Sequence, residues 1–444
     1  MDLKNHLRFL TCERSLGFAA MLCLLTIGTL QSTHAQKLGN LDREHCREML
    51  STIKADIERY YYDPRFHGID LNARFGEADE KIERATSFGQ IFGIIAQVLI
   101  ELNDSHTFFM PPRRASRTEY GWRMQMIGNK CYVVTVTPGS DAEAKGLKPG
   151  DEIYSVNGYE PTRENLWKML YYFYHLRPQP GIRVVVQDTN GQRQLDVKAK
   201  VIIGQNLKLF GADTEDQIRE AQTEARLHRH RHYEIGDDLI IWKMPQFDLS
   251  NQIDGMLNKV RKRKAVILDL RGNPGGAAST LHNLINFFFD HDVKIGDVKT
   301  RNRTNRWVVK SSDGRSFKGK LIVLVDSDSG SAAEVFARVI QLEKRGIVIG
   351  DRTAGAVMGS SHHEHMVGGN VVTFYSVSIT QTDLTMTDGK SLEHVGVTPD
   401  ELLLPTAADI TAKRDPVLSR AAVLIGVKLD PEKASALFPI EWRK

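Results

Sequence analysis

The segment AVILDLRGNPGG, residues 265–276, is an uninterrupted apolar strand that ends in a charged residue and a glycine-rich turn. The segment LIVLVDSDSGSAAE, residues 321–334, repeats this plan and leads into a helical pattern. Strands without polar alternation are typical of parallel sheets whose two faces are covered by helices. An apolar strand at 239–242 and a helical stretch at 281–289 continue the alternation. We therefore predict an α/β layer architecture for a core over residues 233–406.

The glycine-rich turn after the first strand is a candidate part of an active site. Paired glycines such as Gly275 and Gly276 carry no Cβ, so their backbone N–H groups can approach a ligand closely. The alternative is a simple sharp turn at the end of a buried strand.

Ser331 lies in the equivalent place after the second strand, between small residues and before a predicted helix over 332–342. Ser-x-x-Glu before a helix is also a capping box, and Ser331 with Glu334 fits that structural interpretation. Against it, the small neighbours leave the hydroxyl accessible. A helix start also provides N–H groups and positive potential where an oxyanion would form. Ser331 is therefore a candidate nucleophile.

A candidate base for Ser331 lies far upstream, in the segment NDSHT at residues 103–107. A serine nucleophile needs a base that is close in space rather than in sequence. Histidine titrates near neutral pH, which makes His106 a candidate, although an isolated histidine is more often structural.

Two regions precede the core. Apolar residues recur at three- and four-residue spacing over much of 42–103, which predicts a helical N-terminal domain over residues 36–112. Residues 113–205 combine short strands, a tight turn and one long helix, which predicts a small β-rich domain. A polar linker over 206–232 and a helical tail over 407–444 complete the predicted organisation.

Residues 1–35 have the pattern of a signal peptide, because three basic residues precede an apolar run at 16–30 and small residues follow it. The run is shorter than the roughly 20 residues that span a bilayer, so we expect cleavage near Ala35 and no stable membrane anchor. The mature chain is then expected to be secreted or periplasmic in a bacterium.

The composition of all 444 residues is that of an ordinary globular protein, with 41% apolar residues, 26% charged residues and a formal net charge of +4. A charge this small, spread over the chain, gives no sign of nucleic-acid binding. Cys46 and Cys131 remain after the predicted cleavage. A disulfide between them is possible, but we expect two separate buried thiols.

Two histidine clusters raise the question of a metal site. Neither has the helical spacing of a zinc peptidase motif. We interpret the first as a solvated basic segment and the second as strand or loop positions near the active site, and we predict no metal or cofactor. The clusters are His228, His230 and His232, and His362, His363 and His365.

Taken together, the motifs resemble the C-terminal processing, or tail-specific, serine peptidase family. The resemblance rests on segments 269–276 and 329–334 in this order, and on segments 60–64 and 392–400 near either end of the match. It implies a crotonase-like ββα superhelix for the core and an inserted PDZ domain at 113–205.

One position departs from the processing branch of this family. There a catalytic lysine follows a Thr-x-Gly motif, whereas here residues 353–355 are followed by Ala356, so a Ser-Lys dyad cannot form. A second branch, which includes tricorn protease, uses a serine, a histidine, a neighbouring serine and a glutamate. The resemblance assigns these roles to Ser331, His106, Ser105 and Glu393, and the oxyanion hole to the N–H groups of Gly276 and Ala332.

Two alternatives concern the same site. The alternative for Glu393 is a surface acid on a loop, which we rank slightly below the catalytic role. Lys390, three residues earlier, is an alternative base, which we rank below His106 because no family pattern places a lysine there.

Tyr120, Gly121, Trp122, Arg123 and Met124 stand where PDZ domains carry a carboxylate-binding loop. Such a loop holds a peptide C-terminus while the peptide adds to the sheet as an extra strand. We expect polypeptide substrates to bind there, with Trp122 and Met124 favouring an apolar terminal residue. The alternative is a PDZ fold kept as a structural gate.

The leading hypothesis is a serine endopeptidase that hydrolyses unfolded or C-terminally exposed polypeptides through an acyl-enzyme. The alternative is a catalytically silent, PDZ-containing protein of the same fold that binds peptides or other ligands. The distinguishing feature is whether Ser105, His106 and Glu393 all accompany Ser331.

Overall fold

The computed structural model describes residues 38–114, 116–188, 191–203, 222–223, 225–249, 252–311, 316–369 and 372–442. The predicted signal peptide at 1–35 lies outside these residues, as does most of the predicted linker at 206–232. Within the described part of the chain, no helix combines the length and apolar character needed to cross a membrane.

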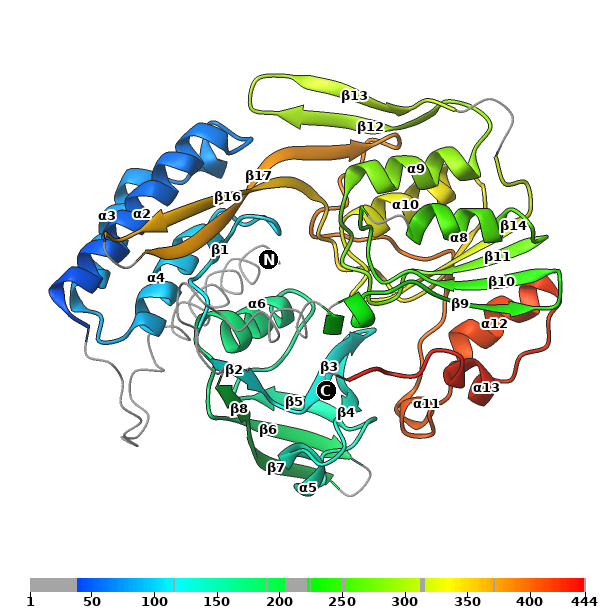
Figure 1. Cartoon of the computed structure of the whole chain (residues 1–444), viewed down its shortest axis with the longest axis horizontal. Helices are drawn as coiled ribbons and strands as arrows, with labels where there is room; N and C mark the ends of the chain where they lie inside the picture. Colours follow the sequence, from blue (N-terminus) through cyan, green and yellow to red (C-terminus); the bar gives the residue numbers. More distant parts are fainter. Residues whose placement is uncertain are drawn as a thin grey trace, which may run out of the picture.

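A six-stranded sheet forms the centre of the core (Figure 1), in the order β18-β15-β14-β11-β10-β9. Neighbouring strands are parallel except β9 and β10. Every residue of β11 is buried, as its continuous apolar sequence predicts. The strands are β9 (Arg231–Ile235), β10 (Leu239–Lys243), β11 (Ala265–Asp269), β14 (Lys320–Val325), β15 (Ile347–Gly350) and β18 (Glu401–Leu402).

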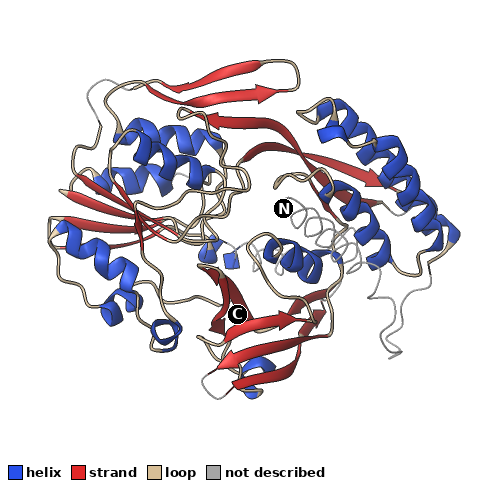
Figure 2. Cartoon of the chain, turned by 180° about the vertical axis from the view of Figure 1, so that it is seen from behind, coloured by secondary structure: helices blue, strands red, loops and turns tan. Residues whose placement is uncertain are grey.

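Helices cover both faces of this sheet (Figure 2). Alternate residues of β11 reach opposite faces: Val266 and Leu268 pack with one group of helices, and Ala265 and Ile267 with the other. The predicted α/β layer architecture is thus confirmed. The first group is α8 (Gln252–Val260), α9 (Ala278–Phe288) and α10 (Ala332–Leu342), and the second is α12 (Pro416–Ile425) and α13 (Pro431–Ala436).

A second, five-stranded sheet joins the core to the N-terminal region. Its strand β1 pairs antiparallel with β17, with Phe109 opposite Val377. This pairing brings the segment 103–107 to the core, although more than 200 residues of chain separate the two strands. The strands are β1 (Phe108–Met110), β12 (Val293–Thr300), β13 (Thr304–Val309), β16 (Met358–Val367) and β17 (Thr373–Met386).

The N-terminal region is helical, as predicted, and its helices pack against β16 and β17 (Figure 1). The first helix ends at Tyr60, shortly before the Asp63-Pro64 pair, because the residue before a proline resists helical geometry. The helices are α2 (Asn40–Tyr60), η1 (Phe66–Gly68), α3 (Leu71–Arg84) and α4 (Phe88–Ile100).

The β-rich region is a five-stranded antiparallel sheet in the order β3-β4-β5-β6-β7. A two-stranded pair of β2 and β8 closes it where the chain enters and leaves. The elements are β2 (Ser116–Glu119), β3 (Trp122–Ile127), β4 (Lys130–Val136), α5 (Asp141–Ala144), β5 (Glu152–Val156), α6 (Leu166–Tyr171), η2 (Tyr172–Leu176), β6 (Gly181–Asp188), β7 (Gly191–Lys198) and β8 (Lys200–Ile203). A short helix, α11 (Ala407–Thr411), follows the core.

The turn between β3 and β4 docks on the core beside a buried ion pair between Arg163 and Asp351. Arg163 Nη2 lies 2.5 Å from Asp351 Oδ2, and the two side chains are only 11% and 7% exposed. Arg163 also donates from Nε to Gly128 O, and Gly128 N–H donates to Asp351. The pair therefore fixes the hairpin turn to the end of β15.

We expect Arg163→Met to lower the free energy of unfolding by about 3 kcal/mol, because it leaves the buried carboxylate of Asp351 without its cation. The control is Arg183→Met, whose ion pair with Asp196 is fully exposed to solvent, so that its loss is expected to change the stability little. Thermal unfolding of both variants measures the difference. Equal losses would show that the Arg163 pair does not hold the docking interface.

Candidate active site

Ser331 lies at a strained turn between β14 and α10. Its φ of 52° and ψ of −118° are rare for a residue with a side chain. Such strain persists only where surrounding contacts fix it, and it is typical of serine nucleophiles at strand-to-helix turns. Here the Ser331 N–H donates to Ala356 O at 2.9 Å and to Glu334 Oε2 at 3.0 Å. The glutamate half of the predicted capping box is therefore present.

Glu334 holds the turn to a second loop. Its fully buried carboxylate also accepts hydrogen bonds from Thr353 Oγ1 and from the N–H groups of Gly355 and Ala356. Burial raises the pKa of Glu334 to about 7, although these donors act in the opposite direction. The sequence indicated only a helix cap at this residue, because its partners at 353–356 are distant along the chain.

The two glycine- and serine-containing turns lie in direct contact. A Cβ added to Gly275 would lie 2.6 Å from Ser331 Cβ, and one on Gly276 would lie 2.4 Å from Phe247 O. Only glycine fits at either position. Among the described residues, no acceptor pairs with the N–H groups of Gly276 or Ala332. Both predicted oxyanion donors are thus unoccupied.

Ser105, His106 and Glu393 lie together, as the assigned roles require. Ser105 Oγ is 2.7 Å from His106 Nδ1 and donates to Glu393 Oε2 at 2.9 Å. Because its one hydroxyl proton goes to the carboxylate, Ser105 accepts from an Nδ1–H group. That tautomer leaves His106 Nε2 unprotonated and able to accept a proton.

Glu393 is a half-buried acid rather than the exposed loop residue of the alternative interpretation. It accepts hydrogen bonds from the N–H groups of Ser105 and Val357, both at 2.7 Å. Val357 follows Ala356, whose carbonyl accepts from the Ser331 N–H. The loop 353–357 therefore connects Ser331 to Glu393, the acid beside His106. In the described part of the chain, no hydrogen bond joins Ser331 to His106. Such bonds often tighten only when substrate is bound.

Asp104 fixes the backbone that carries His106. Its buried carboxylate accepts from the N–H groups of His106 and Thr107, from Thr380 Oγ1 and from Tyr61 OH. No functional role was predicted for Asp104, because a lone acid beside a histidine has many structural uses.

Burial lowers the pKa of His106 below its usual value, Asp104 opposes this effect, and the like charge of His362 adds to it. His106 is therefore neutral near pH 7, as a general base must be. Lys390, the alternative base, is exposed in a turn where its N–H donates to Asp388.

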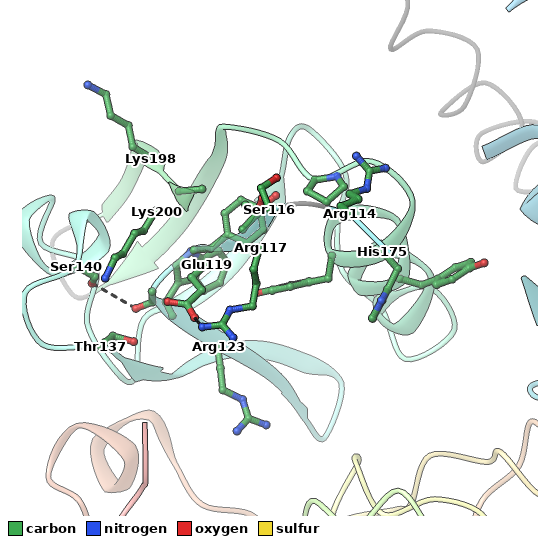
Figure 3. A pocket seen from close by; sticks show the side chains of 18 of the residues that line it. Arg114, Ser116, Arg117, Glu119, Arg123, Thr137, Ser140, His175, Lys198 and Lys200 are labelled. Carbon is green, nitrogen blue, oxygen red and sulfur yellow. Dashed lines mark hydrogen bonds and ion pairs between the residues drawn. The ribbon is translucent and has the colours of Figure 1, made fainter. Parts of the chain in front are cut away.

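Four of the five predicted peptide-binding residues line a cavity of about 1380 Å³ at the start of β3 (Figure 3). Tyr120 and Trp122 are almost fully buried and form its wall, whereas Arg123 is exposed. Met124 lies farther along β3, beyond the cavity. Gly121 has a φ of 77°, and a Cβ there would lie 2.5 Å from Ser140 Cβ, so the loop requires glycine.

Neither histidine cluster forms a metal site in the described residues, which contain no group of three or more His, Cys, Asp or Glu side chains placed to bind an ion. The interpretation of the first cluster as solvated is wrong for His230. This side chain is 1% exposed and accepts from Trp242 Nε1 at 3.0 Å. The second cluster lies on β16, as predicted. Cys46 and Cys131 are separate, buried and free.

A serine at a strand-to-helix turn, with free N–H donors beside it and a histidine oriented by a hydroxyl and a carboxylate, defines a site of the serine hydrolase class. Residues 239–403 match the family model "Peptidase family S41", and residues 112–166 match "PDZ domain". The core thus matches the S41 peptidase family over these 165 residues, and the region before it matches a PDZ domain. The S41 match includes Ser331 and Glu393 but not Ser105 or His106.

Known proteins resemble the chain over most of its described part. The tail-specific protease of Haemophilus influenzae is 28% identical over 57% of this chain and 36% of its own length. The carboxy-terminal processing protease CtpA of Bacillus subtilis is 24% identical over 69% of this chain and 62% of its own length. This chain thus spans less than two thirds of either relative.

Solved structures share the fold, and mature CPAF is one of them. Mature CPAF aligns with a TM-score of 0.62 at 15% identity, over 83% of this chain and 94% of that chain. At this identity the likeness concerns the fold alone, with its helical N-terminal region, PDZ domain and α/β core.

We expect the pKa of His106, followed through its ring resonances by NMR, to lie below the 6.5 of a free histidine. His362→Gln is expected to raise this pKa because it removes a like charge. His363→Gln is the control, since this ring stacks on Tyr60 and leaves the environment of His106 unchanged. A His106 pKa above 6.5, or one insensitive to His362→Gln, would contradict the electrostatic account.

Proposed function

We propose that this chain is a serine endopeptidase that hydrolyses unfolded or C-terminally exposed polypeptides through an acyl-enzyme. The observation that carries the proposal is the hydrogen-bonded series Glu393–Ser105–His106, which leaves His106 Nε2 as the free base. The absence of a lysine at Ala356 then matters little, because the proton acceptor comes from the N-terminal region instead.

In the proposed reaction, His106 Nε2 takes the proton of Ser331 Oγ, which attacks the scissile carbonyl carbon. The N–H groups of Gly276 and Ala332 stabilise the oxyanion, and one such donor contributes roughly 10² to 10³ in rate. His106 then protonates the leaving amine. Water, activated by the same histidine, hydrolyses the ester and restores Ser331.

Glu393 and Ser105 act by orienting His106 and stabilising its positive charge. Burial raises the pKa of Glu393, which brings its titration closer to neutral pH. Its hydrogen bonds from Ser105 and Val357 favour the ionised form. Protonation of Glu393 would weaken the series, so we infer that activity falls on the acid side.

The PDZ domain is proposed to recognise the substrate C-terminus. In the described residues, β3 pairs only with β4, so its other edge can accept a peptide as an added strand. The same hairpin contacts the nucleophile turn, since Gln125 Nε2 donates to Asp326 Oδ2 at 2.8 Å and Ser327 Oγ donates to Met126 O. Recognition and catalysis thus share a contact surface.

We also infer that the enzyme is secreted or periplasmic, because residues 1–35 have the pattern of a signal peptide. For the core we infer the crotonase-like ββα superhelix that the family resemblance implies.

A fluorophosphonate probe tests the function directly, because it forms a covalent bond with an activated serine. We expect the chain to be labelled at Ser331, with no label in Ser331→Ala. His106→Ala is expected to slow labelling by roughly 10² to 10⁴, and Ser105→Ala by less, since it removes only the orientation of the base.

His363→Gln serves as the matched control, because it changes a histidine outside the proposed series. If the wild-type chain takes up no label, or if His106→Ala is labelled as fast, the peptidase mechanism is wrong. The silent PDZ-containing binding protein would then be the better description.

A further inference from the structure

The cavity at the start of β3 lies between the PDZ loop and helical segment η2 (Figure 3). Tyr171, Tyr174 and His175 line it on the helical side, and Gly121 to Arg123 line it on the strand side. Its position at the free edge of β3 places it where the end of an added peptide strand would lie.

The cavity lining carries an excess of positive charge. Of its two acids, Glu119 is neutralised by Arg117 at 2.7 Å, and Asp141 accepts from the backbone N–H of Lys198 at 2.7 Å. The remaining cations have no carboxylate within ion-pair distance among the described residues. They are Arg113, Arg114, Arg123, Lys198 and Lys200.

Two of these cations lie at opposite ends of the cavity in Figure 3. Lys200 lies beside Ser140, and Arg114 lies near His175, whereas Lys198 and Arg123 point away. Arg114 Nη2 donates to Leu176 O at 2.5 Å, a backbone acceptor that carries no charge. Arg114 and Lys200 are both exposed, and neither has an acid within ion-pair distance in the described residues. An anionic group in the cavity would supply the missing counter-charge.

Trp122 adds an unpaired donor to the cavity wall. Trp122 is only 4% exposed, yet within the described part of the chain its Nε1–H has no hydrogen-bond partner. A buried donor without a partner costs about 1 to 3 kcal/mol, so a ligand oxygen that reaches it would recover this energy.

We propose that this cavity selects polypeptide segments with acidic side chains next to the bound end, and that Arg114 and Lys200 determine this specificity. The sequence had suggested selection of an apolar terminal residue by Trp122 and Met124, whereas the cavity adds a requirement for charge. The proposal rests on the proposed function only in taking a polypeptide as the ligand.

The test uses the full chain with Ser331→Ala, so that binding is measured without cleavage. Two fluorescent peptides share one apolar C-terminal residue and differ in carrying glutamates or lysines just before it. We expect the acidic peptide to bind at least tenfold more tightly at low salt, and the difference to shrink at high salt through screening. Arg114→Gln and Lys200→Gln should each weaken the acidic peptide roughly two- to fivefold, as expected for exposed ion pairs.

Lys262→Gln, which removes an exposed cation after α8 in the core, is the matched control and should change neither affinity. Equal binding of the two peptides at low salt would overturn the proposal. So would discrimination that survives the Arg114→Gln/Lys200→Gln double variant. Neither result bears on Ser331, whose reactivity is measured separately with the probe, so failure of the specificity and failure of the peptidase mechanism remain distinguishable.

Discussion

The candidate site depends above all on the buried carboxylate of Glu334. Removing a carboxylate from water is costly unless hydrogen bonds replace its hydration. Glu334 obtains four donors, from Ser331, Thr353, Gly355 and Ala356. Because these donors belong to two separate loops, satisfying one buried charge requires both loops to adopt a single arrangement. The strained backbone of Ser331 is one part of that arrangement.

The base is held to this arrangement through the backbone of the same loop. Ala356 accepts from Ser331 on one side, and Val357 donates to Glu393 on the other. The position where a lysine would stand in the processing branch thus contributes through its backbone, which any residue can supply. The histidine can then come from the N-terminal region, carried by the pairing of β1 with β17 and fixed by Asp104. Loop closure over so long a chain is tolerable, since its entropic cost rises only slowly with length.

Much of the core was predictable from sequence because its strands are continuous apolar runs, and β11, β14 and α10 were expected close to where they lie. The pairing of β1 with β17 was not, because a three-residue strand has no periodicity to detect and its partner lies far along the chain. His230 was misjudged for a related reason. Arginines on either side suggest solvent, but the buried partner Trp242 arrives only through the pairing of β9 with β10.

Asp326 connects the PDZ domain to the candidate site through hydrogen bonds to its carboxylate. Its carboxylate accepts from Gln125 of β3, from the N–H of Gly272 before the oxyanion turn, and from Ser329 beside the nucleophile. One acid therefore contacts the strand whose edge is open to a peptide and both turns of the candidate site. A peptide that adds to β3 would act on a strand already bonded to the catalytic turns. The hydrogen bonds of Asp326 therefore join β3 directly to both turns of the candidate site.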